Sequence, residues 1–245
     1  MVVLWKVEST MDHTVRSYED ELALLDKKIA HMGGLAENNL GQSFEALERR
    51  DPKLAESVIR SDRAIDGLQR DIEEQVISMI ARRQPMADDL RHVMAAIRIS
   101  GDLERIGDLA KNIAKRALAV AHETHPKPLI SGFRHMVELA LRQLKDVLDA
   151  YADRDPQRAL QVWNEDAQID AMYNSLFREL LTYMMEDPRN IGLSTHLLFG
   201  AKNIERVGDH TTNIAETVHY MVHGTSIGDD RPKVEQISAI DMMKG

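Results

Sequence analysis

The chain has 245 residues, enough for one large domain or two small ones, and its 40 acidic and 31 basic residues give a formal charge of −9. Nucleic-acid binding needs clustered Lys and Arg, so this balance argues against DNA or RNA as a partner. Cysteine is absent, which excludes disulfides, thiolate metal sites and cysteine nucleophiles. The start lacks the basic region and cleavage pattern of a signal peptide, and the uncharged run 190–201 is too short to span a bilayer. We therefore expect a cytoplasmic protein that does not itself span a membrane.

The periodic stretches of the chain are typical of helices. They are filled by Leu, Ala, Met and Glu, aromatic residues make up only 4% of the chain, and strand-like alternation is missing. Helical patterning begins at Met11, so residues 1–11 form an N-terminal extension. Gly33 and Gly34 interrupt the first helix, and a close helix contact would explain them. The sequence predicts an all-α fold.

A duplication organises the helices. The segment 49–66, "RRDPKLAESVIRSDRAID", matches 153–170, "DRDPQRALQVWNEDAQID", and "DLERIGDLAKNIAK" at 102–115 matches "NIERVGDHTTNIAE" at 203–216. Each copy reads as three long helices, which predicts two tandem, pseudo-symmetric three-helix bundles. We place the first repeat at 12–125, the second at 126–224, and a polar, mobile tail at 225–245.

Acid–proline pairs mark several helix starts. Asp51, Asp155 and Asp187 each precede a proline, as an N-cap acid precedes a proline at the first helical position. Gln84 before Pro85 is a weaker version of the same signal. We therefore assign these three aspartates to capping rather than to catalysis.

The duplicated motif places its acids on one side of the third helix. At about 100° per residue, Glu104, Asp108 and Asn112 fall opposite an apolar seam, and Glu205, Asp209 and Asn213 do so in the second copy. We therefore expect these side chains to lie outside the bundle core. That position argues against a buried, ferritin-like metal centre.

The second helix of each copy adds an acid pair with a spacing of four, Asp62/Asp66 and Asp166/Asp170. Where this helix packs beside the third, two acid pairs face each other and repel unless a cation lies between them. Hard oxygen ligands of this kind suit Mg, Mn, Fe and, in part, Zn. The simpler alternative is a solvated acidic surface in which Arg105 and Arg206 pair with the acids.

Across nearly its whole length the chain resembles the PhoU family of phosphate-uptake regulators. The resemblance rests on "ARRQPMADDLR" (81–91), "DLERIGD" (102–108), "NEDAQID" (164–170), "YMMED" (183–187) and "NIERVGD" (203–209). It implies two three-helix bundles with E/D-x-x-x-D motifs that in some members hold multinuclear metal clusters on the bundle surface. The candidate ligands are Asp62, Asp66, Glu104, Asp108, Asn112, Asp166, Asp170, Glu205, Asp209 and Asn213.

The resemblance also implies a function and its partners. The protein would be a regulatory adaptor, not an enzyme, that links the ATPase subunit of a phosphate ABC transporter to the cytoplasmic part of a sensor histidine kinase. It would repress the phosphate-starvation response, and we expect a homodimer. Arg91 and Arg98 are candidates for binding an acidic partner.

Two other functions stay open at this point. The first is a carboxylate-bridged metal-binding protein, an iron store or oxidase, because Asp89-x-x-His92 and Glu216-x-x-His219 match the Glu-x-x-His spacing of di-iron bundles. The positions of these two motifs are not equivalent in the two copies, which weighs against this function. The second is a metal-free structural scaffold. The sequence has no Gly-rich phosphate loop, nucleophile–base pair or nucleotide fingerprint.

Overall fold

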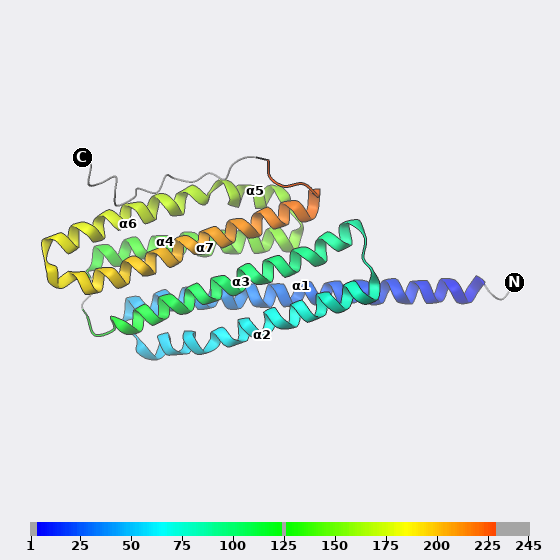
Figure 1. Cartoon of the computed structure of the whole chain (residues 1–245), viewed down its shortest axis with the longest axis horizontal. Helices are drawn as coiled ribbons and strands as arrows, with labels where there is room; N and C mark the ends of the chain where they lie inside the picture. Colours follow the sequence, from blue (N-terminus) through cyan, green and yellow to red (C-terminus); the bar gives the residue numbers. More distant parts are fainter. Residues whose placement is uncertain (1–3, 124–125, 229–245) are drawn as a thin grey trace.

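The computed structural model describes residues 4–123 and 126–228. Its elements are α1 (Leu4–Arg49), α2 (Pro52–Arg83), α3 (Ala87–Ala119), α4 (Lys127–Asp153), α5 (Pro156–Asn164), α6 (Asp166–Glu186), the short 3₁₀ helix η1 (Pro188–Asn190) and α7 (Ile191–His223) (Figure 1). Within these ranges there is no strand, and the all-α prediction is confirmed. Most of the tail predicted at 225–245 and the first three residues of the predicted extension lie outside the described residues.

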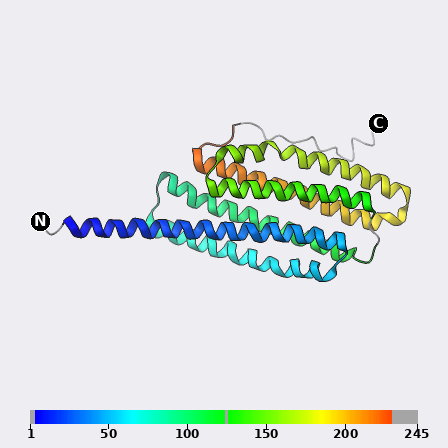
Figure 2. The same ribbon diagram turned by 180° about the vertical axis from the view of Figure 1, so that it is seen from behind.

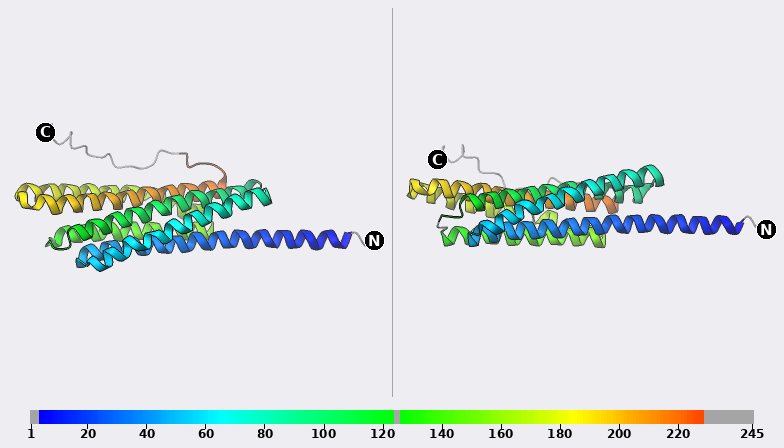
Figure 3. Two further views of the ribbon diagram at one scale, coloured as in Figure 1. Left: turned by 60° about the horizontal axis from the view of Figure 1, so that its bottom comes forward. Right: turned by 90° about the horizontal axis from the view of Figure 1, so that it is seen from below.

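The first helix is longer and more regular than the sequence suggested. It begins at Leu4 rather than near Met11, and it runs without a break through Gly33 and Gly34. Figures 2 and 3 show its N-terminal part continuing past the end of the other helices. A Cβ at Gly33 would lie 2.7 Å from Cδ1 of Leu148 in α4, whereas one at Gly34 would meet nothing within 4 Å. The predicted interruption is wrong, and the predicted close contact exists at Gly33 alone.

The acid–proline signals identify real caps. The carboxylates of Asp51 and Asp155 each accept hydrogen bonds from the backbone amides two and three residues further on, at 2.9 and 3.1 Å. Asp187 caps η1 in the same way through one amide at 2.9 Å. The Gln84 prediction is wrong, because this residue ends α2 in the left-handed conformation (φ 49°) and α3 begins three residues later, at Ala87.

The middle helix is continuous in the first repeat and divided in the second. The division falls at Glu165, between α5 and α6. At the break, the Glu165 carbonyl accepts hydrogen bonds from the Gln168 amide at 3.0 Å and from the buried side chain of Gln143 in α4 at 3.1 Å. The predicted tandem helical bundles are therefore confirmed, and the one departure from three unbroken helices is this interruption of the middle helix in the second repeat.

The two repeats share one continuous apolar core. Helix α3 packs on α1 and α2 of its own repeat and also on α7 of the other, while α1 packs on α4. At this junction the fully buried Phe133 stacks on Phe44 with ring centroids 6.0 Å apart. Helices α3 and α7 thus lie side by side at the centre (Figure 1), with two different faces of each covered by neighbours.

A partly buried polar network also joins the repeats. Tyr151 of α4 donates to Asp26 Oδ1 in α1 at 2.7 Å, and Nε2 of His92 in α3 lies 2.7 Å from the same oxygen. The guanidinium of Arg154 is 2.8 Å from His92 Nδ1, which makes this nitrogen the acceptor and leaves Nε2 to donate to Asp26. Burial and the Asp26 carboxylate raise the pKa of Tyr151 well above its ordinary value, so its hydroxyl stays a donor.

None of the helices in the described part of the chain has the length and apolar character needed to cross a membrane.

Candidate metal centres: two acidic clusters

A glycine in each copy of the motif brings the middle and last helices of a repeat together. A Cβ at Gly107 of α3 would lie 2.8 Å from Cδ1 of Ile65 in α2, and one at Gly208 of α7 would lie 3.0 Å from Cδ1 of Ile169 in α6. A larger residue at either position would therefore have to displace the isoleucine side chain packed against it. The two glycines thus allow a close approach of the middle and last helices beside the acids of the motif.

The first cluster is held together by a lysine. Its members are Asp62 and Asp66 of α2 with Glu104, Asp108 and Asn112 of α3. The ammonium group of Lys111 donates to Asp108 Oδ1 at 2.6 Å and makes a short hydrogen bond to Asp62 Oδ2. Lys111 therefore joins the two helices by binding one carboxylate from each. The amide oxygen of Asn112 instead lies 3.5 Å from the exposed Lys115.

The acids of the first cluster are held in a partly desolvated, crowded place. Burial raises the pKa of Asp62, and nearby Asp66 and Asp108 add to the effect. Burial also raises the pKa of Glu104, and again neighbouring acids add to it. Although burial disfavours the charged ammonium, the hydrogen bonds to Asp108 and Asp62 raise the pKa of Lys111 well above its ordinary value. The lysine is therefore a permanent positive charge at neutral pH.

Arg105 adds weaker compensation from the outside. Its Nε lies 3.4 Å from Glu104 Oε2, and its Nη1 lies 3.8 Å from Asp108 Oδ2. The side chain is mostly exposed, so these pairs are worth only ~0.5 kcal/mol each. Arg105 therefore pairs with the acids, as the simpler alternative predicts, although Asp62 of this cluster is buried rather than solvated.

In the second cluster, different residues compensate the charge of the acids. Its members are Asp166 and Asp170 of α6 with Glu205, Asp209 and Asn213 of α7. The hydroxyl of Thr212 lies 3.0 Å from Asp166 Oδ1, and Lys202 Nζ is 2.7 Å from Glu205 Oε1. The other oxygen of Glu205, Oε2, is buried and has no hydrogen-bond partner. The second cluster thus contains an unsatisfied carboxylate oxygen, a costly feature in a folded protein, and the first contains another, Asp62 Oδ1.

The environment of Glu205 favours its neutral form. Burial raises its pKa, and the nearby charges of Asp209 and Asp170 raise it further against the opposing effect of Lys202. Lys202 also lies 5.2 Å from the ring centroid of Tyr173, whose own pKa is raised by burial and by Glu205. A cation that reached the free oxygen of Glu205 would relieve this cost.

The prediction that the acids of the third helices lie outside the core is wrong for Glu205, which is only 5% exposed. In the middle helices Asp62 and Asp166 are each 3% exposed. The other seven candidates are partly buried, and none of the ten is fully exposed. The helical angles were right, but they identified only one packed face, whereas α3 and α7 each pack on several neighbours. The acids therefore lie between helices, at the rim of the core.

The two motif asparagines are not equivalent. Asn213 donates to Asp102 Oδ1 of α3 at 3.3 Å, and Nδ1 of His210 lies 2.8 Å from the same oxygen. Both contacts cross from one repeat to the other. Asn213 therefore joins the repeats, while Asn112 lies near Lys115 on its own helix. As ligands to metal, both asparagines remain predictions.

The residues fit a metal unequally in the two clusters. No three His, Asp or Glu side chains of residues 17–123 and 126–228 are grouped as a metal ion requires. In the first cluster the ammonium of Lys111 lies between carboxylates of both helices. In the second, the neutral Thr212 hydroxyl takes that place. Both clusters hold a buried, unpartnered carboxylate oxygen of the type that a hard cation prefers, Asp62 Oδ1 and Glu205 Oε2, so the bridging residue makes the difference.

The motifs of the di-iron alternative do not form a site. His92 binds Asp26 and Arg154 rather than approaching an acid of its own helix. Glu216 accepts a hydrogen bond from Nε1 of Trp163 at 3.1 Å, and Nδ1 of His219 faces a backbone carbonyl, that of Thr225. Since paired, inward-facing Glu-x-x-His motifs define such centres, this geometry gives the oxidase alternative no support.

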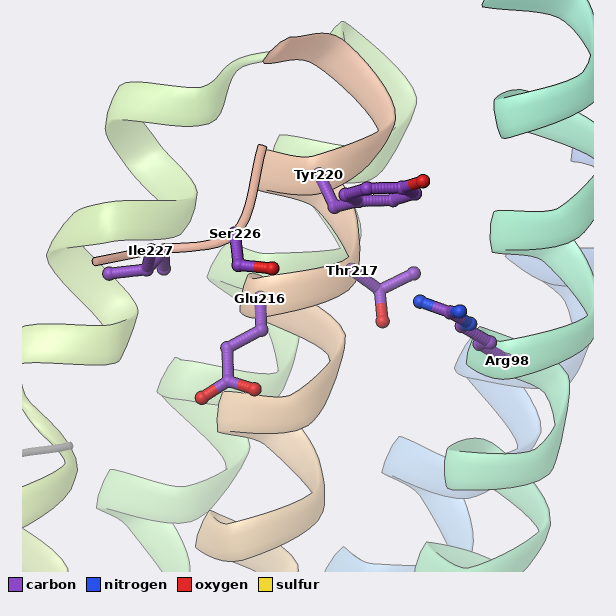
Figure 4. A pocket seen from close by; sticks show the side chains of 6 residues that line it. All are labelled: Arg98, Glu216, Thr217, Tyr220, Ser226 and Ile227. Carbon is purple, nitrogen blue, oxygen red and sulfur yellow. The ribbon is translucent and has the colours of Figure 1, made fainter. Parts of the chain in front are cut away.

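The two candidate partner-binding arginines lie at the α3–α7 junction. Arg91 donates to the backbone carbonyl of Met221 at 3.4 Å and pairs with Asp88. Arg98 lies in a pocket of about 350 Å³, where its guanidinium approaches Thr217 and lies 5.6 Å from the ring centroid of Tyr220 (Figure 4). Arg91 therefore stabilises the repeat interface, and Arg98 is the more accessible of the two.

Sequence reasoning missed the cations of both clusters. Lys111 follows Asp108 by three residues and Lys202 precedes Glu205 by three, so a search for charge pairs with helical spacing finds them. No such search finds the contact between Lys111 and Asp62, because these residues are 49 positions apart.

Together, the fold and the clusters define a class of protein: an all-α molecule of two tandem helical repeats, each with acid pairs on its middle and last helices. The family model described as "PhoU domain" matches residues 29–117 and 133–218, one match inside each predicted repeat. The chain therefore belongs to the PhoU family.

Relatives and solved structures agree with this assignment. A phosphate-specific transport system accessory protein PhoU homolog of Rhizobium meliloti is 54% identical and covers 93% of this chain and 96% of its own. A homolog of the same description from Caulobacter vibrioides is 50% identical, with 93% and 99% covered. The crystal structure of PhoU from Pseudomonas aeruginosa matches with a TM-score of 0.82 at 38% identity, over 85% of this chain and all of that one. The phosphate transport system regulatory protein PhoU from Streptococcus pneumoniae gives 0.80 at 29%, over 86% and 99%.

Proposed function

We propose that the protein regulates phosphate transport as an adaptor rather than as an enzyme. The observation that carries the proposal is the similarity, over nearly the full length of both chains, to relatives named as accessory proteins of the phosphate-specific transport system. In detail, the protein acts in the cytoplasm, binds the ATPase subunit of a phosphate ABC transporter and the cytoplasmic part of a sensor histidine kinase, and represses the phosphate-starvation response. It does so as a homodimer.

The shape of the molecule supports docking of this kind. The elongated helical body offers long helix faces (Figure 3), and the side chains of Met86 and Met185 stand exposed near the ends of helices. Methionine adapts its shape to different partners, and exposed apolar groups favour protein contacts. Because α3 and α7 share one core, a partner bound to one repeat acts on a rigid body that includes the other.

Binding and expression measurements test the proposal together. The purified full chain should bind the purified transporter ATPase and the cytoplasmic part of the kinase in titration calorimetry, and size-exclusion chromatography with light scattering should report a dimer. Deletion of the gene should raise the expression of phosphate-starvation genes at high phosphate, and the full chain should restore repression. Unchanged expression in the deletion strain would contradict the regulatory role.

A further inference from the structure

The two acidic clusters differ at one structurally equivalent position. In the aligned motifs, Lys111 of α3 corresponds to Thr212 of α7. Each side chain contacts the first acid of the neighbouring middle helix: Lys111 binds Asp62, and the Thr212 hydroxyl lies 3.0 Å from Asp166. The same place in the fold therefore holds a positive charge in one repeat and a neutral hydroxyl in the other.

Lys111 fills the place that a bridging cation would need in the first cluster. Its ammonium contacts one carboxylate from α2 and one from α3, as a metal joining the helices would. A divalent ion at this place would meet a positive charge within a few ångströms, and the two carboxylate oxygens nearest to it are already used. The first cluster is therefore closed to a divalent metal as long as Lys111 stays there.

The second cluster has a cation of a different kind. Lys202 contacts Glu205 alone, from the same helix, and its side chain is 36% exposed, compared with 23% for Lys111. It can move into solvent without separating two helices. Glu205, only 5% exposed, presents the buried Oε2 that has no hydrogen-bond partner. Each cluster has a buried carboxylate oxygen without a hydrogen-bond partner, Asp62 Oδ1 in the first and Glu205 Oε2 in the second. The clusters differ at the bridging position, which holds a positive charge in the first and the neutral Thr212 in the second.

We propose that Lys111 is a built-in substitute for a divalent cation in the first cluster, so that metal binds only to the second. The ion is a hard divalent cation, bound by carboxylate oxygens that include those of Glu205. The negative charge of the acids would then be compensated by an ammonium group in the first repeat and by a metal ion in the second.

Reciprocal substitutions test the proposal. Full-length protein freed of metal by chelation is dialysed against Mn²⁺, and the bound metal is counted by mass spectrometry. The wild type should bind metal, Glu205→Gln should lose at least 80% of it, and Glu104→Gln should keep it. Lys111→Thr should gain at least one equivalent, and Thr212→Lys should bind less than a fifth of the wild-type amount.

Two controls separate binding from folding. Lys115→Thr removes a lysine from the same helix, one turn further on, and should leave the metal content unchanged. Circular dichroism of each variant reports its helix content, and Mn²⁺ should raise the melting temperature of Lys111→Thr by more than that of the wild type. A wild type that binds no Mn²⁺, a Glu205→Gln variant that keeps its metal, or a Lys111→Thr variant that gains none would overturn the proposal.

Discussion

The first and second repeats share their cap and close-packing residues but compensate the charge of their acids with different residues. Asp51 and Asp155 cap the middle helices with identical hydrogen-bond distances, and Gly107 and Gly208 admit the same isoleucine contact. Yet Lys111 joins two helices in the first cluster, whereas the second has a hydroxyl at that place. Cap and close-packing residues therefore fix the helix positions, while the residues that compensate the acidic charge can differ between the repeats.

Truncation of the isoleucine packed against each motif glycine should have the largest effect. It tests whether this contact is equally important for stability in both repeats. Ile65 and Ile169 are almost completely buried against the motif glycines. Ile65→Ala and Ile169→Ala should each lower the free energy of unfolding by about 2–5 kcal/mol, because each leaves a cavity between two helices. Urea denaturation measures the loss, and the exposed Ile77→Ala should change it by less than about 0.5 kcal/mol. A large loss in one repeat alone would show that the two are not packed alike.

Removal of the lysine of each cluster should have the next largest effect, and it tests whether the two lysines differ in their contribution to stability. In metal-free buffer, Lys111→Met should cost about 1–3 kcal/mol, since it leaves the buried Asp62 carboxylate without its partner. Lys202→Met should cost less than about 1 kcal/mol, since this lysine is more exposed and contacts one acid. Thermal and urea unfolding of both variants measure the costs. Equal losses would contradict the different roles assigned to the two lysines.

Removal of the N-cap of each middle helix should have an intermediate effect on stability, equal in the two repeats. Asp51→Ala and Asp155→Ala should each cost about 1 kcal/mol, because each leaves two amides at a helix start without their acceptor. Asp51→Asn and Asp155→Asn keep a capping oxygen and should cost much less. Urea denaturation of the four variants measures the effect, and a loss in the asparagine variants as large as in the alanine variants would contradict capping as its cause.

The smallest effect is a pH dependence. Burial, together with nearby Asp209 and Asp170, raises the pKa of Glu205 above its ordinary value of 4.5, so the native state binds this proton before the unfolded state does. Ionised Glu205 thus destabilises the fold at neutral pH, and the penalty disappears as pH falls through the raised pKa toward 4.5. Glu205→Gln should be more stable than the wild type at pH 7 by less than about 1 kcal/mol, with a smaller difference at pH 5.

Denaturation in chelator at several pH values measures this difference, because bound metal would mask it. Asp51→Asn, which removes a carboxylate that belongs to neither cluster, is the matched control. A stability difference between Glu205→Gln and the wild type that grows as pH falls would contradict the assignment.

Most of the fold follows from local signals. The helices, the duplication and the three aspartate caps are predictable because periodicity and N-capping depend on residues within one or two turns. The split between α5 and α6 is not, because one of the two groups that donate to the Glu165 carbonyl at the break, the Gln143 side chain, comes from another helix. The Gln84 prediction is wrong for a related reason, since a residue before a proline can end one helix as readily as it starts the next.

The ten candidate ligands are also present where the motifs put them, but their surroundings depend on neighbours. Local sequence determines which residues form the helices and which acids lie on the same side of each helix, because the angle between two side chains of one helix depends only on their spacing. Only the tertiary structure decided that Asp62, Asp166 and Glu205 are buried and that Lys111 joins α2 to α3. Burial and cross-helix charge pairs depend on which other helices cover a face, and periodicity contains no information about them.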